Sequence, residues 1–410
     1  MLGGERDRGD VDAREALTRL LAPLGVGSEL GGYTIEALSE AHGMRVVLAR
    51  QATRVFLEVD ARDDRHPAAV RTRRLAISYR GADPARPLAA SEGRRLASLL
   101  AAHLEAREEG VLAALADEAA RARASSHGET RVREVEVVRA LEPAGEGAER
   151  LETISPYVGC LVACSFCYAQ ERLHRTRALF GLPAARWGSW VDARTNVVEV
   201  LRAELASDRS VLPVKLCPIV SDPYHAIERR LRLTRGVLEA LAADGRREVL
   251  VLTRSALVRD DLALLARARA HLGVSLPSVR PEIHAALEPR SAPFEERLAI
   301  LAEARALGVR TFVMVQPVLD EHIAQLADAI ARVAGSAQVD VLRGTYGAAE
   351  AFRDPALTAL ANEARQHELA DQLRAALAVR GVPVWEGELP PGTAAERSET
   401  RPSRPPRSTP

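Results

Sequence analysis

Hydrophobic and polar positions follow two different patterns along the chain, and the first predicts an antiparallel sheet. Short apolar runs with strand character, separated by turn residues, occupy 33–38, 44–49, 54–60 and 74–81. This spacing is typical of an antiparallel meander. A helical pattern precedes it over 13–25, and another follows over 91–124 with a break expected at Gly110. Residues 1–125 are therefore expected to form a separate α+β domain.

From residue 126 onward, apolar strands alternate with amphipathic helices. The expected strands are 151–157, 211–220, 248–253, 274–276, 310–318 and 339–342. Nearly all-apolar strands that alternate with helices indicate parallel pairing with helices outside. The predicted fold class is α/β, with a partial (β/α)6 TIM-like barrel or open curved sheet over 126–345. A reactive site would then lie at the carboxyl ends of the strands.

The rest of the chain predicts no further site. A helix is expected over about 356–380, within a C-terminal helical extension at 346–389. Residues 390–410 are rich in Pro, Ser and Arg, a composition typical of disorder.

Composition and charge exclude some classes of protein. The chain has 410 residues, with 56 basic and 56 acidic side chains and 4% aromatic residues. The balanced charge gives no whole-protein case for nucleic acid, and the low aromatic content disfavours a base-stacking platform. No apolar run approaches the ~18 residues of a membrane-spanning helix, and the first fifteen residues lack the apolar core of a secretory signal. We expect a cytoplasmic protein without membrane contact.

The most specific chemical signal is a cysteine triplet. Cys160, Cys164 and Cys167 form C-x3-C-x2-C in SPYVGCLVACSFCYA, directly after the first strand of the alternating region. Thiolates are the ligands of iron–sulfur clusters, and a 4Fe-4S cube usually takes four. Three protein ligands would leave one iron open for chemistry. The alternative is a zinc site of three cysteines plus a histidine, with His174 as the nearest candidate.

With Phe166 just before its third cysteine, the triplet resembles the radical SAM superfamily. The resemblance implies a 4Fe-4S cluster whose open iron is chelated by S-adenosylmethionine. One electron from the cluster cleaves this cosubstrate to a 5′-deoxyadenosyl radical, which abstracts a hydrogen atom from the substrate. It also implies that a reduced flavodoxin or ferredoxin delivers the electron.

The resemblance extends over about 153–319 to the DNA-repair-photolyase-like branch, which includes spore photoproduct lyase. Besides the cysteine segment, four segments have the sequence pattern of this branch: VSDPYHAIERRLRLTRGVLEAL, VLTRSALVRDDLALL, VSLPSVRPEIHAALEPRSAPFEERLAIL and VMVQPVL. The branch implies that Ser221 and Asp222 hold the amino group of S-adenosylmethionine. Arg254 stands where the family usually has lysine and would hold the carboxylate. Ser275 matches a position near the ribose.

Two further residues bear on hydrogen transfer. Cys217 lies two residues before the position at which the family has a hydrogen-donating cysteine, a distance of one side-chain period in a strand. A small core residue is the other interpretation of Cys217. Tyr168 matches the family tyrosine after the third cysteine, a hydrogen-relay partner. Phe166 replaces a tyrosine found in the lyase.

Other conspicuous residues have structural interpretations. Glu228 and Arg229 follow the SDPY turn, and Glu288 with Arg290 and Arg297 could form an ion-pair network. For all five residues, structural pairing around the barrel rim is the expected role. Trp187 and Trp190, in RWGSW, are expected to pack rather than to line a substrate site.

Three hypotheses for the activity stay open. The first is radical repair or modification of nucleic acid, and the second is radical modification of a peptide or small metabolite gripped by the N-terminal domain. The third is a non-catalytic iron–sulfur protein that keeps the cube without cleaving the cosubstrate.

Overall fold

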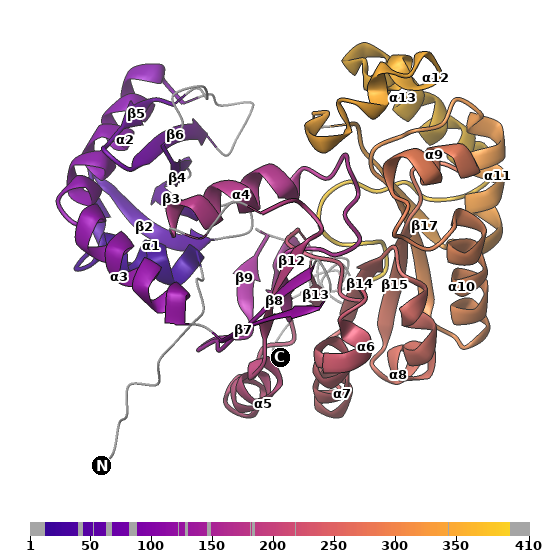
Figure 1. The fold of residues 1–410 in the computed structure, drawn as a ribbon, viewed down its shortest axis with the longest axis horizontal. Coiled ribbons are helices and arrows are strands. Elements are labelled where there is room, and N and C mark those ends of the chain that lie inside the picture. Colours follow the sequence, from indigo (N-terminus) through magenta and orange to yellow (C-terminus); the bar gives the residue numbers. More distant parts are fainter. Residues whose placement is uncertain are drawn as a thin grey trace, which may run out of the picture. The chain divides into compact units, whose positions relative to one another are not determined.

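The computed structural model of the chain forms two compact units. It describes residues 13–39, 44–51, 53–62, 68–81, 88–121, 123–127, 130–145, 149–180, 182, 185–217, 219–342 and 344–393. The first unit takes the described residues of 1–138 and 169–196, and the second takes those of 139–168 and 197–410 (Figure 1). The chain therefore passes between the units three times.

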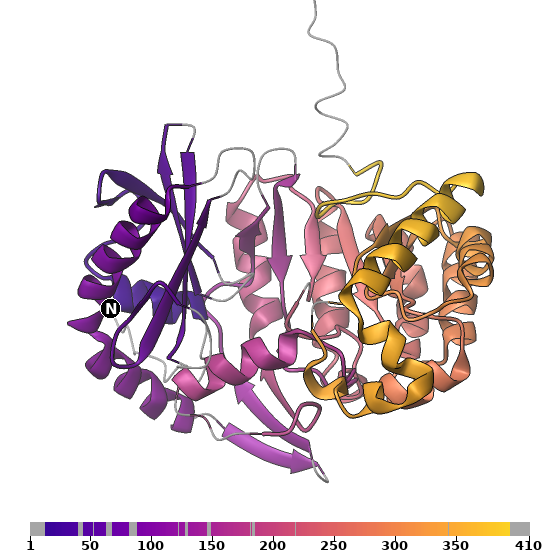
Figure 2. The same cartoon turned by 90° about the horizontal axis from the view of Figure 1, so that it is seen from above.

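The first unit contains the antiparallel sheet that the sequence predicts. Its strands are β1 (Glu29–Leu30), β2 (Tyr33–Ser39), β3 (Met44–Arg50), β4 (Thr53–Ala61), β5 (Val70–Arg71) and β6 (Leu75–Gly81). They are ordered β1-β2-β3-β4-β6-β5, and every pairing is antiparallel. Helices α1 (Ala13–Leu21), α2 (Ala90–Glu105) and α3 (Glu108–Arg121) contribute leucines to the core on this sheet (Figure 2).

The break between α2 and α3 falls at residues 106–107, so the break expected at Gly110 is wrong. Gly110 lies inside α3. The turn places Glu108 at the start of α3, where its side chain is fully buried. Its carboxylate accepts hydrogen bonds from the Thr72 hydroxyl and the Arg73 amide. A buried carboxylate needs such donors, and this requirement explains the position of the break.

The first unit also takes in residues that were expected to begin the barrel. Strand β8 (Thr130–Val135) pairs antiparallel with β7 (Arg123–His127) and parallel with β12 (Trp190–Arg194). Helix α4 (Ala169–Leu179) contacts β4. The boundary expected at residue 125 therefore differs from the observed division, because 126–138 and 169–196 complete the first unit. Long-range strand pairing of this kind is not visible in a local pattern.

The second unit is built on a seven-stranded curved sheet, a half-barrel. Its strands are β9 (Glu142–Ala144), β10 (Leu151–Ile154), β13 (Val214–Leu216), β14 (Val249–Thr253), β15 (Ala270–Ser275), β16 (Arg310–Val315) and β17 (Ser336–Val339). The order is β17-β16-β15-β14-β13-β10-β9, with the first six parallel and β9 antiparallel to β10. The predicted partial (β/α)6 barrel is therefore confirmed.

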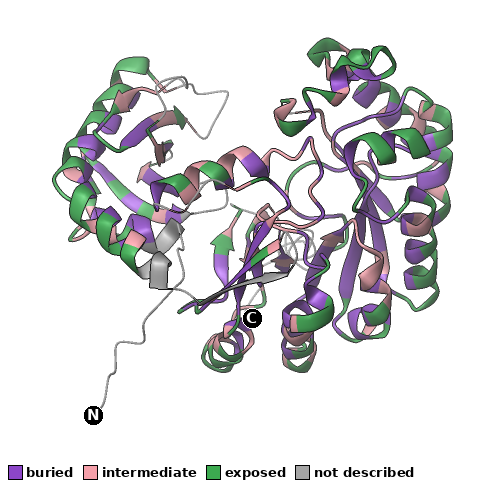
Figure 3. Ribbon diagram, viewed as in Figure 1, coloured by how far each residue is buried: buried purple, intermediate pink, exposed green. Residues whose placement is uncertain are grey.

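Helices follow the strands around the outside of this sheet (Figure 1). They are α5 (Val197–Ser207), α6 (Glu228–Leu231), α7 (Leu233–Asp244), α8 (Leu262–Arg267), α9 (Pro281–Leu287), α10 (Phe294–Ala306) and α11 (Ile323–Val333). Strand residues are buried and the outward faces of the helices are exposed (Figure 3). Pro293 directly precedes α10, and the hydroxyl of the nearby Ser291 donates to the Glu288 carbonyl rather than capping the helix.

Two strands differ from their predicted bounds for steric reasons. The strand expected at 211–220 is reduced to Val214–Leu216, because Cys217 has a left-handed φ of 45° that ends it. The strand expected at 274–276 begins earlier, at Ala270, so that Gly273 lies within β15. A Cβ at Gly273 would lie 2.2 Å from the Phe312 ring, so only glycine fits beneath that ring.

The C-terminal part packs on the second unit. The helix expected at 356–380 is split into α12 (Pro355–Thr358) and α13 (Glu363–Val379), with the Asn362 side chain capping the latter. Val384 forms a parallel bridge with Ala337 next to β17. Residues 390–393 are described and Thr393 is fully buried, so the tail expected to be disordered from residue 390 does not begin there. Residues 394–410 lie outside the described residues. Among the described helices, none is long and apolar enough to cross a membrane.

Candidate functional site

The three cysteines lie in one loop at the carboxyl end of β10. Cys164 is buried, whereas Cys160 and Cys167 are partly exposed, and none of them forms a disulfide. The loop turns sharply at Ala163, which has a left-handed φ of 57°. The amide of Cys167 donates to the Cys164 carbonyl at 3.1 Å. The loop thus presents three thiols from eight consecutive residues.

Neighbouring strand ends hold this loop. The amide of Gly159 donates to the Val220 carbonyl at 3.0 Å, and the Ser221 hydroxyl donates to the Gly159 carbonyl at 2.6 Å. On the other side, the amide and hydroxyl of Ser165 donate to the Leu287 carbonyl at 2.9 and 3.0 Å. These contacts fix the loop between the segments that follow β13 and β15.

A buried ionic network lies beside Cys164. Glu288 is fully buried, and its Oε2 lies 3.7 Å from Cys164 Sγ and 3.1 Å from Arg254 Nε. Its Oε1 lies 3.0 Å from Nη1 of Arg297, which is 1% exposed. Arg297 also donates to the Ser275 carbonyl at 2.7 Å. The ends of β14 and β15 and the cysteine loop are therefore linked through one carboxylate. The expected pairing of Glu288 with Arg297 is present, and Arg254 contacts the same carboxylate. Arg290 is exposed.

Asp222 links the ends of β13 and β14. Its Oδ1 accepts from the Tyr224 amide at 2.8 Å and the Thr253 hydroxyl at 2.7 Å. Its Oδ2 accepts from the Arg254 amide at 2.7 Å. Burial raises the pKa of Asp222, against the effect of these three donors. Since an ionised carboxylate offers about four acceptor positions, one remains for a further donor such as an ammonium group.

The surroundings of the three thiols favour ligation to a positively charged metal cluster. Although Cys160 as a whole is partly exposed, desolvation of its thiol, with Asp222 and Cys167 nearby, raises the pKa of Cys160 to about 12. Burial also raises the pKa of Cys164 well above its usual value, although Arg254 opposes the shift. Thiolates in this loop therefore need a positive charge that the loop itself does not supply. Iron ligation replaces the thiol proton and provides that charge, so the donor set fits an iron–sulfur cluster.

A single metal ion does not fit the described residues. No three His, Cys, Asp or Glu side chains within the described ranges are gathered as ligands of one ion. A cube differs because it places each thiolate on a different iron. His174 belongs to the first unit, where it lies beside Arg177 and the backbone of Ala185, and burial lowers its pKa. The zinc alternative therefore gains no support.

The other sequence-predicted residues lie as follows. Phe166 is buried, and its ring centroid lies 5.7 Å from the Arg254 guanidinium carbon. Ser275 is 1% exposed at the last position of β15. Tyr168 is partly exposed and immediately precedes α4. Cys217 is buried, and its amide donates to the Ile154 carbonyl at 2.9 Å. Since β13 ends before Cys217, the argument from strand period does not apply to its thiol.

Sequence reasoning missed a buried polar group beneath the loop. The Tyr157 hydroxyl donates to Glu228, whose carboxylate also accepts from the amides of Thr234 and Arg235 at the start of α7. His225 is 1% exposed, with its ring 4.6 Å from that of Tyr157. No signal in the sequence pairs Tyr157 with Glu228, which lies 71 positions away. Glu228 thus has the structural role expected, with Tyr157 as its partner.

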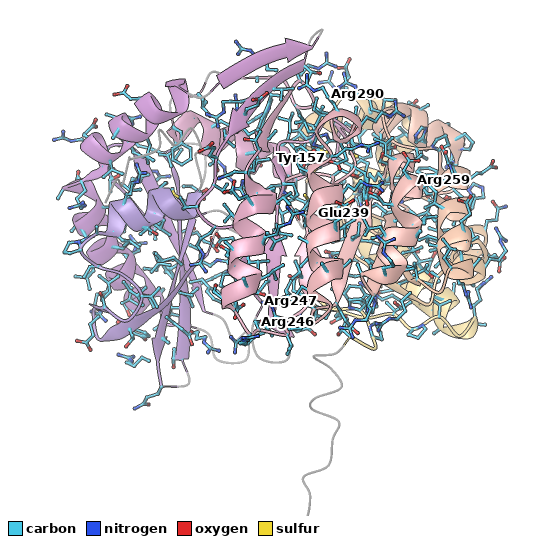
Figure 4. The ribbon with its side chains drawn as sticks, turned by 90° about the horizontal axis from the view of Figure 1, so that it is seen from below. Tyr157, Glu239, Arg246, Arg247, Arg259 and Arg290 are labelled. Carbon is cyan, nitrogen blue, oxygen red and sulfur yellow. The ribbon has the colours of Figure 1, made fainter. Side chains whose placement is uncertain are left out.

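The site lies at the carboxyl ends of the strands, where the sequence argument expected it. Figure 4 shows Tyr157 and Arg290 toward one end of the second unit, and Arg246 and Arg247, which precede β14, toward the other. Arg247 is fully buried and pairs with Glu152, Asp208 and Asp244, so this opposite end is held by structural ion pairs.

Comparison with protein families identifies the type of domain that contains the cysteine loop and the strands around it. The model of the radical SAM superfamily matches residues 154–330. This segment is a radical SAM domain. Radical SAM enzymes bind a 4Fe-4S cluster and S-adenosylmethionine, and they require an electron donor and a substrate. The cofactors expected from the sequence are therefore confirmed as those of the family.

Relatives of the radical SAM domain occur in bacteria and archaea. An uncharacterized protein of Mycobacterium tuberculosis (Rv2578c) is 35% identical over 207 residues, which cover 47% of this chain and 59% of that protein. An uncharacterized protein of Methanocaldococcus jannaschii (MJ0683) is 28% identical over 171 residues, covering 42% and 61%. The chain thus spans about three fifths of the length of these relatives.

Solved structures are also similar to parts of the chain. Spore photoproduct lyase complexed with dinucleoside spore photoproduct matches with a TM-score of 0.45 and 14% identity, covering 62% of this chain and 81% of that one. The radical S-adenosylmethionine methyltransferase TsrM from Kitasatospora setae matches with a TM-score of 0.34 and 16% identity, covering 47% and 34%.

Proposed function

We propose that this protein is a cytoplasmic radical SAM enzyme with its cluster on Cys160, Cys164 and Cys167. When bound, the cluster supplies the electron that cleaves S-adenosylmethionine to a 5′-deoxyadenosyl radical, which abstracts a hydrogen atom from the substrate. The observation that carries the proposal is the loop of three thiols held at the carboxyl end of a six-strand parallel sheet. A reduced flavodoxin or ferredoxin is the proposed electron donor.

The residues around the loop would orient the cosubstrate. Asp222 has one acceptor position left, and Ser221 presents hydroxyl lone pairs beside it, which suits an ammonium group. Arg254 has the charge to bind the methionyl carboxylate, and Glu288 and Phe166 restrict its position. Ser275 would lie near the ribose.

Hydrogen transfer is assigned to two residues. We propose Cys217 as a hydrogen donor and Tyr168 as its relay partner. Support for Cys217 is its burial directly after β13 at the same end of the sheet as the cysteine loop. Its left-handed backbone also removes it from the regular strand.

The experiment is anaerobic reconstitution followed by incubation with S-adenosylmethionine and dithionite. The wild-type chain should hold four irons per chain and form 5′-deoxyadenosine, whereas Cys164→Ser should lose the cluster signal. Cys217→Ala is the matched control because it removes a buried thiol outside the loop, and it should keep the cluster. An intact cluster without 5′-deoxyadenosine would support the non-catalytic alternative and refute the enzyme.

A further inference from the structure

The first unit contains a sheet face on which positive charge is concentrated. Strands β8 and β12 run parallel, with Arg131 beside Trp190 and Arg133 beside Asp192. Because side chains alternate along a strand, these four share one face. Arg194 follows Asp192 on the same face and is 5% exposed.

Helix α4 adds a further guanidinium to this face. The guanidinium carbon of Arg177 lies 4.0 Å from the centroid of the Trp190 ring, and Nη1 lies 3.9 Å from Asp192 Oδ1. Asp192 also accepts two hydrogen bonds from Arg133, at 2.9 and 2.7 Å. One carboxylate is therefore shared by two arginines, while Arg131 and Arg194 add two more positive charges to the face.

The electrostatics of Arg177 reflect its burial together with the charges around it on this face. Its pKa is lowered from the ordinary value, first by burial and then by Arg133 and Arg131, despite the attraction of Asp192. Burial of a cation is unfavourable unless negative charge compensates it. A bound anion would add to the compensation that Asp192 already gives.

Two tryptophans supply an independent observation. The indole nitrogens of Trp187 and Trp190 are buried, and neither N–H meets an acceptor among the described residues. The two side chains are 9% and 2% exposed, and their rings contact each other edge to face at 6.4 Å. A buried N–H without an acceptor is rare in native proteins. The face thus offers hydrogen-bond donors and positive charge together, and a ligand rich in acceptor oxygens would satisfy both.

We propose that this face, built from β8, β12 and α4, binds a phosphate group of the substrate. Guanidinium forks match phosphate oxygens, and tryptophan N–H groups donate without accepting. The exposed Arg131 provides access from solvent. The inference rests on the proposed function only in assigning the phosphate to a substrate. A phosphodiester of nucleic acid and a small phosphorylated metabolite share this chemistry.

Fluorescence of the full-length chain tests the proposal, because Trp187 and Trp190 would report binding directly. The chain has three tryptophans, so Trp385→Phe leaves these two as reporters. The protein is used with its cluster, anaerobically and without reductant, so that no turnover occurs. The probes are a dinucleoside monophosphate, its uncharged methylphosphonate analogue, and pyrophosphate.

We expect a saturable change with the dinucleoside monophosphate or pyrophosphate and none with the methylphosphonate. Saturation by the dinucleotide points to nucleic acid, and saturation by pyrophosphate alone points to a small metabolite. Affinity should fall as salt rises. Arg177→Gln should weaken binding about tenfold or more, the loss expected for one charge-assisted hydrogen bond. Arg332→Gln, at an exposed position of α11, is the control and should bind as wild type.

Arg131→Gln keeps the test valid if Arg177→Gln does not fold, because Arg131 is exposed. It should weaken binding while leaving the unfolding midpoint unchanged. The proposal is overturned if no charged probe gives a saturable change, if the methylphosphonate binds equally well, or if Arg131→Gln binds as wild type. Formation of 5′-deoxyadenosine is measured separately, so phosphate binding without it would refute the radical enzyme and leave the phosphate site standing.

Discussion

Replacement of Glu288 by glutamine should destabilise the second unit. Glu288 is fully buried and lies 3.0 Å from Arg297, which is itself 1% exposed. Its other oxygen lies 3.1 Å from Arg254. Removing one partner of a buried ion pair costs about 3–5 kcal/mol, because the other charge stays buried without compensation. Glutamine keeps the shape and one acceptor oxygen, so we expect a loss near the lower limit, about 3 kcal/mol.

The assay is urea unfolding of the cluster-free full-length chain under anaerobic, reducing conditions. Trp187→Phe and Trp190→Phe are introduced so that Trp385 reports the second unit alone. With a slope of about 1–3 kcal/mol per molar urea, Glu288→Gln should lower the midpoint by about 1 M or more. The matched control is Glu296→Gln, which breaks an ion pair with Arg259 at 2.9 Å whose side chains are 36% and 38% exposed. Exposed pairs contribute below about 1 kcal/mol.

A double-mutant cycle separates the ion pair from the burial of each residue. If Glu288 compensates the charge of Arg297, Arg297→Leu should cost much less in the Glu288→Gln background than in the wild type. Residues in one network show coupling of about 0.5–3 kcal/mol. Strict additivity, or a midpoint for Glu288→Gln equal to that of the Glu296→Gln control, would refute the reasoning.

Three further predictions concern pH, packing and the cosubstrate. Burial lowers the pKa of His225 from 6.5 to about 3. Below pH 6.5 the unfolded chain therefore binds a proton that the folded chain does not. The free energy of unfolding should fall by about 1.4 kcal/mol for each pH unit of acidification. Between pH 7 and 5, the urea midpoint of His225→Gln should therefore change less with pH than the midpoint of the wild type. Equal pH dependences of the two proteins would contradict this prediction. Gly273→Ala should lower the free energy of unfolding by about 1–3 kcal/mol through overlap with Phe312. Gly110→Ala, which has open space around it, should raise it by about 0.5–1 kcal/mol. Thermal unfolding compares the two variants, and an unchanged stability of Gly273→Ala would refute the steric argument. Arg254→Lys should retain S-adenosylmethionine binding by calorimetry and Arg254→Ala should weaken it at least tenfold, so equal affinities would exclude a carboxylate contact.

The sequence predicted features that depend on local pattern. The strands from Tyr33 to Gly81 and the six parallel strands of the half-barrel follow from apolar periodicity, and the cysteine spacing indicated the superfamily. It did not predict the contact of Cys164 with Glu288, because the two are separated by 124 positions and meet only when β10 and β15 lie in the same sheet. A local sequence pattern contains no information about contacts between residues so far apart in the chain.

Other errors arose from residues that have more than one structural use. Glycine often ends helices, but Gly273 lies inside a strand, where its missing side chain makes room for the Phe312 ring on the next strand. The domain boundary expected at residue 125 differs from the division into units for a related reason: β8 pairs with β12, and 54 residues separate the end of one from the start of the other. In each case the deciding partner is remote in the sequence.

The path of the chain has a consequence for how this protein can be divided. The first unit is assembled from two stretches, and the cysteine loop occupies the excursion between them, with α4 beginning two residues after Cys167. Trimming one end of the gene therefore removes neither unit cleanly, and a single protease cut cannot release the first unit whole. Because α4 begins so soon after the triplet, only one residue of backbone separates the first unit from Cys167, the last cysteine of the triplet.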